Sequence, residues 1–125
     1  MNSLSVEERE KLKDEIIKAL KKVYDPEIPI NVYDLGLIYD IDVREDGTVK
    51  ITYTLTAVGC PIAFMMGELI KSAAASVKGV KDVEVELTWE PPWTPEKMTE
   101  EGRKTFKELY GYDIVEAWKR VKKQQ

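Results

Sequence analysis

The sequence predicts an α+β fold, a small two-layer sandwich built on a mixed sheet. Apolar residues recur at helical spacing in two segments and alternate with polar residues in three others. These segments follow the order α-β-β-α-β, and short C-terminal helices come after them. A strand, a helix and a further strand in one sheet favour a right-handed parallel crossover. We therefore expect the second and third strands to be parallel, as neighbours or separated by one strand, with the first strand antiparallel.

The first helix is predicted from Ser5, where Ser-Val-Glu-Glu forms a capping box, to about Tyr24. Its apolar positions at helical spacing are Leu12, Ile16, Ala19, Leu20 and Val23. The next stretch, DPEIPINVYDLG, contains Pro26, Pro29 and Gly36, which are incompatible with a regular helix or a central strand. We expect an ordered, irregular loop there.

A β-hairpin follows this loop, because apolar and polar residues alternate on both sides of the turn-forming pair Asp46-Gly47. The apolar positions are Leu37, Tyr39, Ile41 and Val43 before the turn and Val49, Ile51, Tyr53 and Leu55 after it. The pattern is a strong signal for a hairpin of two antiparallel strands.

The second helix is predicted to begin at Pro61, with Cys60 as its N-cap, and to end at Gly79. Its apolar stripe comprises Ile62, Met66, Leu69, Ile70, Ala73 and Val77. A third alternating strand follows, at Val83, Val85, Leu87 and Trp89. Beyond it, Trp89, Pro91, Pro92 and Trp93 form an aromatic corner that either covers the core or offers a docking surface. Short helical turns over 94–109 and one last amphipathic helix complete the prediction.

The composition leaves few catalytic options. The 125 residues, 43% of them hydrophobic and 34% charged, are expected to form one domain over 1–125. The absence of histidine excludes Ser-His-Asp triads, cysteine-histidine dyads and most zinc sites. No glycine-rich nucleotide-binding motif is present.

Charge and cysteine content indicate the compartment and the partners. The net charge of −4 is uneven: residues 1–96 carry 11 basic and 18 acidic side chains, and residues 97–125 carry 8 and 5. The acidic body argues against a nucleic-acid partner, which would require a basic face. The uncharged run 51–67 is shorter than the roughly 20 apolar residues that span a bilayer, so no membrane partner is expected. One cysteine cannot form an internal disulfide, and the N-terminus lacks an apolar signal stretch, so we expect the cytoplasm.

Cys60 and a group of carboxylates are the candidate functional residues. A cysteine at a helix N-terminus meets free N–H groups and about half a positive charge, which lowers the thiol pKa below about 8.5 and favours the metal-binding thiolate. The alternative is a small buried hydrophobe. Asp25, Glu27 and Asp34 lie within ten residues of the predicted loop. They either hold turns or bind a hard cation.

Three separated motifs together resemble the MIP18-like family, which includes SufT-type iron-sulfur maturation factors, PaaD-type proteins and a domain fused to Mrp-type cluster carriers. The motifs are YDPEIPINVYDLGLIYDIDV, TYTLTAVGCPIAFMM and GVKDVEVELTWEPPWTPEKMTEEGR. The match runs in register over about 10–105, and the helical extension over about 110–125 lies beyond it. The small α+β fold of the family agrees with the predicted element order.

The resemblance implies a non-enzymatic factor that assists iron-sulfur cluster assembly and delivery, with Cys60 as the key thiol and metal ligand. It implies that Asp25, Asp34 and Thr56 line the same site, to which we add their neighbours Glu27 and Gly59. The implied partners are iron-sulfur assembly or carrier proteins and recipient apoproteins.

The number of cysteines limits how a cluster could be bound. Clusters usually take four protein ligands, mostly cysteine thiolates, so one Cys60 cannot hold a cluster alone. We expect no stably bound cofactor, and at most a transient iron-sulfur cluster or iron, shared across a homodimer or with a partner protein. Two alternatives remain: a PaaD-like accessory protein of a multicomponent phenylacetate-type oxygenase, and a cysteine-dependent enzyme without histidine. PaaD-type proteins typically add a cysteine-rich C-terminal segment, which this chain lacks.

Overall fold

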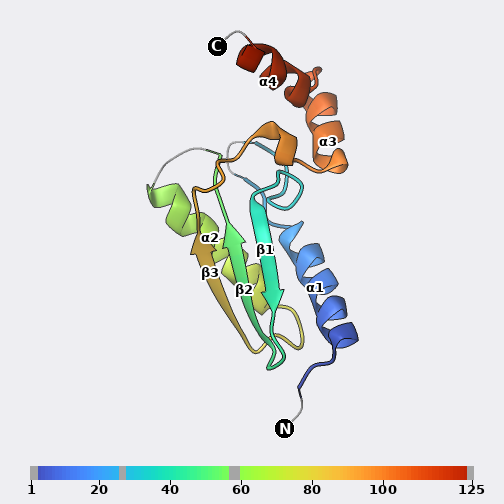
Figure 1. Cartoon of the computed structure of the whole chain (residues 1–125), viewed down its shortest axis with the longest axis vertical. Coiled ribbons are helices and arrows are strands. Elements are labelled where there is room, and N and C mark those ends of the chain that lie inside the picture. The colour runs from blue at the N-terminus through green and yellow to red at the C-terminus, as the bar shows by residue number, and fades with distance from the viewer. Residues whose placement is uncertain (1–2, 26–27, 57–59, 124–125) are drawn as a thin grey trace.

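A computed structural model describes residues 3–25, 28–56 and 60–123 (Figure 1). The first five elements are α1 (Val6–Leu20), β1 (Ile38–Val43), β2 (Thr48–Tyr53), α2 (Cys60–Ala75) and β3 (Asp82–Leu87). They are followed by the 3-10 helix η1 (Pro95–Lys97), α3 (Glu100–Tyr110) and α4 (Ile114–Lys123). The predicted α+β class and element order are confirmed.

The three strands form a mixed sheet in the order β1-β2-β3. β1 pairs antiparallel with β2, and β2 pairs parallel with β3, so the predicted crossover joins neighbouring strands. The register places Ile51 of β2 between Ile41 of β1 and Val85 of β3. α1 and α2 pack against each other and against the sheet, which gives the second layer (Figure 1).

The core lies between these two layers. Its fully buried side chains include Ile16 and Leu20 from α1, Ile51 from β2, and Met66 and Ile70 from α2. Burying an aliphatic side chain of this size stabilises the fold by roughly 1.5–3 kcal/mol. The opposite face of the sheet carries polar residues, as the period of two in a strand requires.

α1 starts as predicted but ends earlier. The Ser5 hydroxyl accepts the N–H of Glu8 at 3.1 Å, and the Glu8 carboxylate accepts the N–H of Ser5 at 3.2 Å, which completes the capping box. The helix ends at Leu20 and not near Tyr24. The N–H groups of Lys22 and Val23 donate to carbonyls three residues earlier, which ends the α-helical pattern. Tyr24 then forms a β-bridge with Asn31, which requires extended backbone.

α2 differs from the prediction in three details. It begins at Cys60, one residue before Pro61, so Cys60 is the first helical residue and not the cap. It ends at Ala75, because tighter turns follow before Gly79, whose φ is +102°. Leu69, assigned to the buried stripe, is 43% exposed, and the buried side of the helix instead runs through Met66, Ile70 and Ala74.

The segment after β3 closes one end of the sheet. The indole N–H of Trp93 donates to the carbonyl of Leu35 at 2.6 Å, and the Tyr39 hydroxyl donates to the carbonyl of Pro91 at 2.7 Å. Trp93 packs against the core, whereas Trp89 is 41% exposed. Of the two roles considered for the aromatic corner, Trp93 therefore serves as a cover for the core.

Candidate functional site

The candidate site lies at the end of the sheet where β1 begins and where β2 and β3 end. At this end the carbonyl of Leu37 accepts the N–H of Thr54 at 2.8 Å, and the carbonyl of Tyr53 accepts the N–H of Thr88 at 2.9 Å. α2 begins at the same end, because the helix of a parallel crossover runs back along the strands (Figure 1). The loop before β1, the segment after β2 and the first turn of α2 therefore share one end of the molecule.

Tyr53 fixes the first turn of α2 to the sheet. Its hydroxyl donates to the carbonyl of Ala63 at 3.2 Å. Gly67 makes room for this contact, because a Cβ there would lie 2.5 Å from the hydroxyl oxygen. Burial, with a smaller contribution from the Glu68 carboxylate, raises the pKa of Tyr53, so the phenol remains a donor at neutral pH. Sequence reasoning treated Tyr53 only as a core residue, although a buried tyrosine usually needs a partner for its hydroxyl.

Cys60 occupies the first position of this anchored helix. The first turn of an α-helix has N–H groups without intrahelical partners and carries about half a positive charge. No acidic residue lies in the first turn of α2 to oppose that charge. A lowered thiol pKa stays a prediction, because the side chain of Cys60 lies outside the part of the chain that is described, as do Glu27 and Gly59.

Asp25 and Asp34 both hold turns of the loop before β1. The buried Asp25 accepts the N–H of Ile28 at 3.0 Å. Asp34 accepts the side-chain amide of Asn31 and the hydroxyl of Thr99, each at 2.7 Å. Because Thr99 is the N-cap of α3, Asp34 ties the loop to that helix. α3 begins on the β1 side of the sheet and α2 on the β3 side (Figure 1), so the observed contacts link Asp34 with α3.

Two threonines follow β2, and one of them is unusual. Thr56 is half-buried in a bend, whereas Thr54 is completely buried, and its hydroxyl has no hydrogen-bond partner among the described residues. Burial raises the pKa of Tyr39, and the Thr54 hydroxyl partly offsets this shift, which shows that the two hydroxyl groups are neighbours. Their geometry nevertheless does not qualify as a hydrogen bond. Sequence reasoning missed Thr54, because the alternation in β2 assigned it to a polar position.

Beside the first turn, α2 presents an exposed apolar surface, formed by Phe64, Met65 and Leu69. Phe64 is 73% exposed, and Met65 and Leu69 are each exposed by more than two fifths. No charged residue occurs between Cys60 and Gly67. Contiguous exposed apolar side chains are typical of surfaces that bind other proteins. The signal in the sequence was Phe64, an aromatic residue that does not fit the buried stripe.

The described residues contain neither a cluster of metal-binding side chains nor a transmembrane helix. No three histidine, cysteine, aspartate or glutamate side chains in that part of the chain lie close enough together to hold a metal ion. None of its helices combines the length and the apolar character that a transmembrane span requires.

The sequence matches a known protein family. The family model described as "Iron-sulfur cluster assembly protein" matches residues 13–87, a range that includes β1, β2, β3 and Cys60. The chain belongs to this family. The resemblance to the MIP18-like, SufT-type proteins inferred from the three motifs is thereby confirmed.

Individual relatives agree with the family match. The chain is 53% identical over 89 residues to the "Fe-S protein maturation auxiliary factor" of Porphyromonas gingivalis, with 71% of this chain and 85% of the relative covered. It is 48% identical over 90 residues to "Fe-S protein maturation auxiliary factor YitW" of Bacillus subtilis, with 72% and 88% covered. The crystal structure of a domain of unknown function from Bacillus anthracis, 30% identical, superposes with a TM-score of 0.74 and covers 82% of this chain and 97% of that one.

Proposed function

We propose that this protein is a non-enzymatic maturation factor that assists the delivery of iron-sulfur clusters to recipient proteins through the thiol of Cys60. The observation that carries the proposal is the position of the only cysteine, at the start of α2 and inside the range that matches the family. The names of the relatives, maturation auxiliary factors and not enzymes, support the same role. The cytoplasm suits such a factor, because a reducing compartment keeps the thiol free.

In this proposal the cluster is cargo that two proteins hold together. The chain offers one thiolate and no histidine, whereas clusters usually take four protein ligands, most of them cysteine thiolates. A partner therefore supplies the remaining ligands, and Cys60 acts during transfer. A soft thiolate suits this task, because it binds iron in clusters more readily than the carboxylate oxygens of Asp25 and Asp34 do.

The exposed apolar surface of α2 supports a role that depends on protein partners. Phe64 and Met65 lie one turn beyond Cys60 and Pro61, so a protein docked on them lies beside the cysteine. Methionine adapts to differently shaped surfaces, which suits a factor that serves several recipient, assembly or carrier proteins. Participation of Asp25, Glu27, Asp34, Thr56 and Gly59 in the same site stays a prediction.

Replacement of Cys60 by serine tests the proposal. In cells that carry Cys60→Ser, we expect the activity of a cluster-dependent recipient enzyme to fall to the level of cells that lack the protein. The fold should persist, because serine is well tolerated at a helix start, and the free energy of unfolding should change by no more than about 1 kcal/mol. Urea denaturation of both purified proteins measures this change.

A displaced thiol provides the matched control. Ser72 is exposed on α2 three turns beyond Cys60, so Ser72→Cys in the Cys60→Ser background restores a surface thiol at the wrong place. We expect no recovery of the recipient enzyme. Recovery would mean that any surface thiol suffices, and full maturation by Cys60→Ser alone would refute the proposal.

A further inference from the structure

The outer edge of β3 is an open sheet edge. β3 is the last strand of the sheet, its ladder hydrogen bonds run to β2, and the N–H of Val83 donates to the Asp82 carboxylate at 2.9 Å. Within the described part of the chain, no other strand lies on the outer side of β3, whereas α2 packs against β3 and begins on that side of the strand (Figure 1). The other edge strand, β1, is partly covered by α1 and by the segment after β3, through the bond between Tyr39 and Pro91. Apart from the N–H of Val83, the backbone groups along the free side of β3 can therefore pair with another extended chain.

This edge is strongly acidic on its solvent face. Asp82, Glu84 and Glu86 are all exposed, and they alternate with residues that face α2. Only Glu86 has an ion-pair partner in the described part of the chain, the ammonium of Lys50 at 2.8 Å. The same face of β1 adds Asp40 and Asp42, so five carboxylates share the face with two cations. The members of this set are Asp40, Asp42, Asp82, Glu84 and Glu86, with Arg44 and Lys50.

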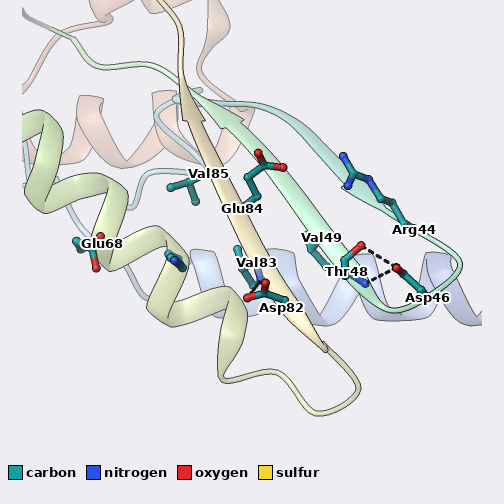
Figure 2. A pocket seen from close by; sticks show the side chains of 10 residues that line it. Arg44, Asp46, Thr48, Val49, Glu68, Asp82, Val83, Glu84 and Val85 are labelled. Carbon is teal, nitrogen blue, oxygen red and sulfur yellow. Dashed lines mark hydrogen bonds between the residues drawn. The ribbon is translucent and has the colours of Figure 1, made fainter.

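The side chains around the edge leave space for another strand. A hollow of about 510 Å³ lies along β3, and its lining includes Val83, Val85 and Glu84 of the strand and Glu68 of α2. Figure 2 shows Glu68 and α2 on one side of β3 and the hairpin residues Arg44 and Thr48 on the other. The lining also includes two cations, Lys71 of α2 and Arg44 of the hairpin, against four carboxylates, Asp46, Glu68, Asp82 and Glu84. The edge thus offers valine surface together with an excess of carboxylates.

We propose that β3 takes up an extended, basic segment of a partner protein as a fourth strand. Lysine or arginine at every second position would face Asp82, Glu84 and Glu86, and the alternate aliphatic residues would lie beside Val83 and Val85. Main-chain hydrogen bonds supply binding in such strand addition, and the alternating side chains supply selectivity. This inference does not depend on the proposed function, although a strand paired with β3 would reach the end of the sheet where α2 begins.

A second copy of this chain does not fit the same edge. Antiparallel pairing of β3 with another β3 places the carboxylates of two acidic strands next to one another, and like charges opposite each other in a sheet are destabilising. Charge complementarity therefore selects a basic partner segment over self-association.

The experiment uses the full chain, labelled with nitrogen-15, and the peptide acetyl-Lys-Val-Lys-Thr-Lys-Val-Lys-amide. We expect the peptide to shift the amide resonances of residues 82–87 and to slow their hydrogen exchange. The same peptide with alternate backbone nitrogens methylated keeps its charge but cannot form the ladder, and we expect it to bind at least tenfold more weakly. No shift at millimolar peptide, shifts confined to other residues, or equal binding of the methylated peptide would each overturn the proposal.

Two matched variants separate a local from a general charge effect. The pair Asp82→Lys and Glu84→Lys reverses charge at the edge, and we expect it to weaken binding at least tenfold while the amide resonances of α2 and β1 stay in place. The pair Asp40→Lys and Asp42→Lys makes the same charge change on the far strand, and we expect the affinity to stay within threefold. Equal losses in both pairs would show general attraction and refute the strand-addition model.

Discussion

Among single residues, Thr54 combines complete burial with a hydroxyl that has no hydrogen-bond partner among the described residues. An unpaired buried hydroxyl costs about 1–3 kcal/mol, and an apolar group of the same shape avoids that cost. We therefore expect Thr54→Val to raise the free energy of unfolding by about 1 kcal/mol. Urea denaturation measures the change.

The control for this prediction is Thr52→Val, the same replacement two residues earlier at a half-buried position on the polar face of β2. We expect it to leave the free energy of unfolding within about 0.5 kcal/mol of the wild type. A loss of stability specific to Thr54→Val would mean that the hydroxyl does form a hydrogen bond, for which the neighbouring Tyr39 hydroxyl is the first candidate, and the prediction would be wrong. Because Thr54 lies at the candidate site, a stable variant with poorer maturation would point to a functional use of the hydroxyl.

At the scale of the elements, the start of α4 should lose stability at acidic pH. The Asp113 carboxylate accepts the N–H of Val115 at 2.9 Å and the guanidinium of Arg103 at 3.1 Å. Burial alone would raise the pKa of Asp113, but these hydrogen bonds outweigh it and the pKa is lowered. A carboxyl group whose pKa is lowered by folding stabilises the folded state at pH values above its unfolded pKa of about 3.9. This stabilisation is lost as the pH falls through the pKa of the folded state.

We accordingly expect the amide resonance of Val115 to titrate with a midpoint below about 3.9, and helix content to decrease over the same range. Asp113→Asn keeps an oxygen that can cap the helix but has no charge, so its helix content should not show this transition. A midpoint at or above the unfolded value, or an unchanged transition in Asp113→Asn, would contradict the assignment.

Elements defined by local signals were the ones that the sequence predicted well. The capping box at Ser5 and the Asp46-Gly47 turn act within a few residues, and both were found in place. The early end of α1 and the exposure of Leu69 depend on what each segment packs against, which local periodicity does not record. The bond between Trp93 and Leu35 joins residues 58 positions apart. No spacing rule could have predicted that contact.

In the candidate site, too, local signals predicted some features and tertiary contacts determined the others. The pattern around Pro61 placed a helix start within one residue of the observed position, so Cys60 was found from local rules. The attachment of Asp34 to Thr99 spans 65 positions, and the contact of Tyr53 with α2 depends on the small size of Gly67. Both require the tertiary arrangement, and neither residue carried a local signal for these contacts.

At the scale of the whole molecule, the sheet is covered on one face and open on the other. The open face carries the excess of carboxylates, and the β3 edge contains three of them, Asp82, Glu84 and Glu86. Charged side chains on an exposed edge prevent strand pairing between copies. The same residues that are proposed to select a basic partner therefore also protect the protein from self-association.

Removal of these charges should allow copies of the protein to pair through β3. In the triple variant Asp82→Asn, Glu84→Gln and Glu86→Gln, β3 becomes a neutral strand with alternating valines, and we expect self-association that rises with concentration, measured by sedimentation velocity. The loss of Glu86 should also lower the pKa of Lys50, which their ion pair raises. The matched control neutralises three exposed carboxylates of α1, Glu7, Glu10 and Asp14, and changes the net charge equally without altering a sheet edge. Equal association of both triple variants would mean that net charge alone keeps the copies apart. If neither variant associates, the shape of the edge and not its charge prevents strand pairing, and the prediction is wrong.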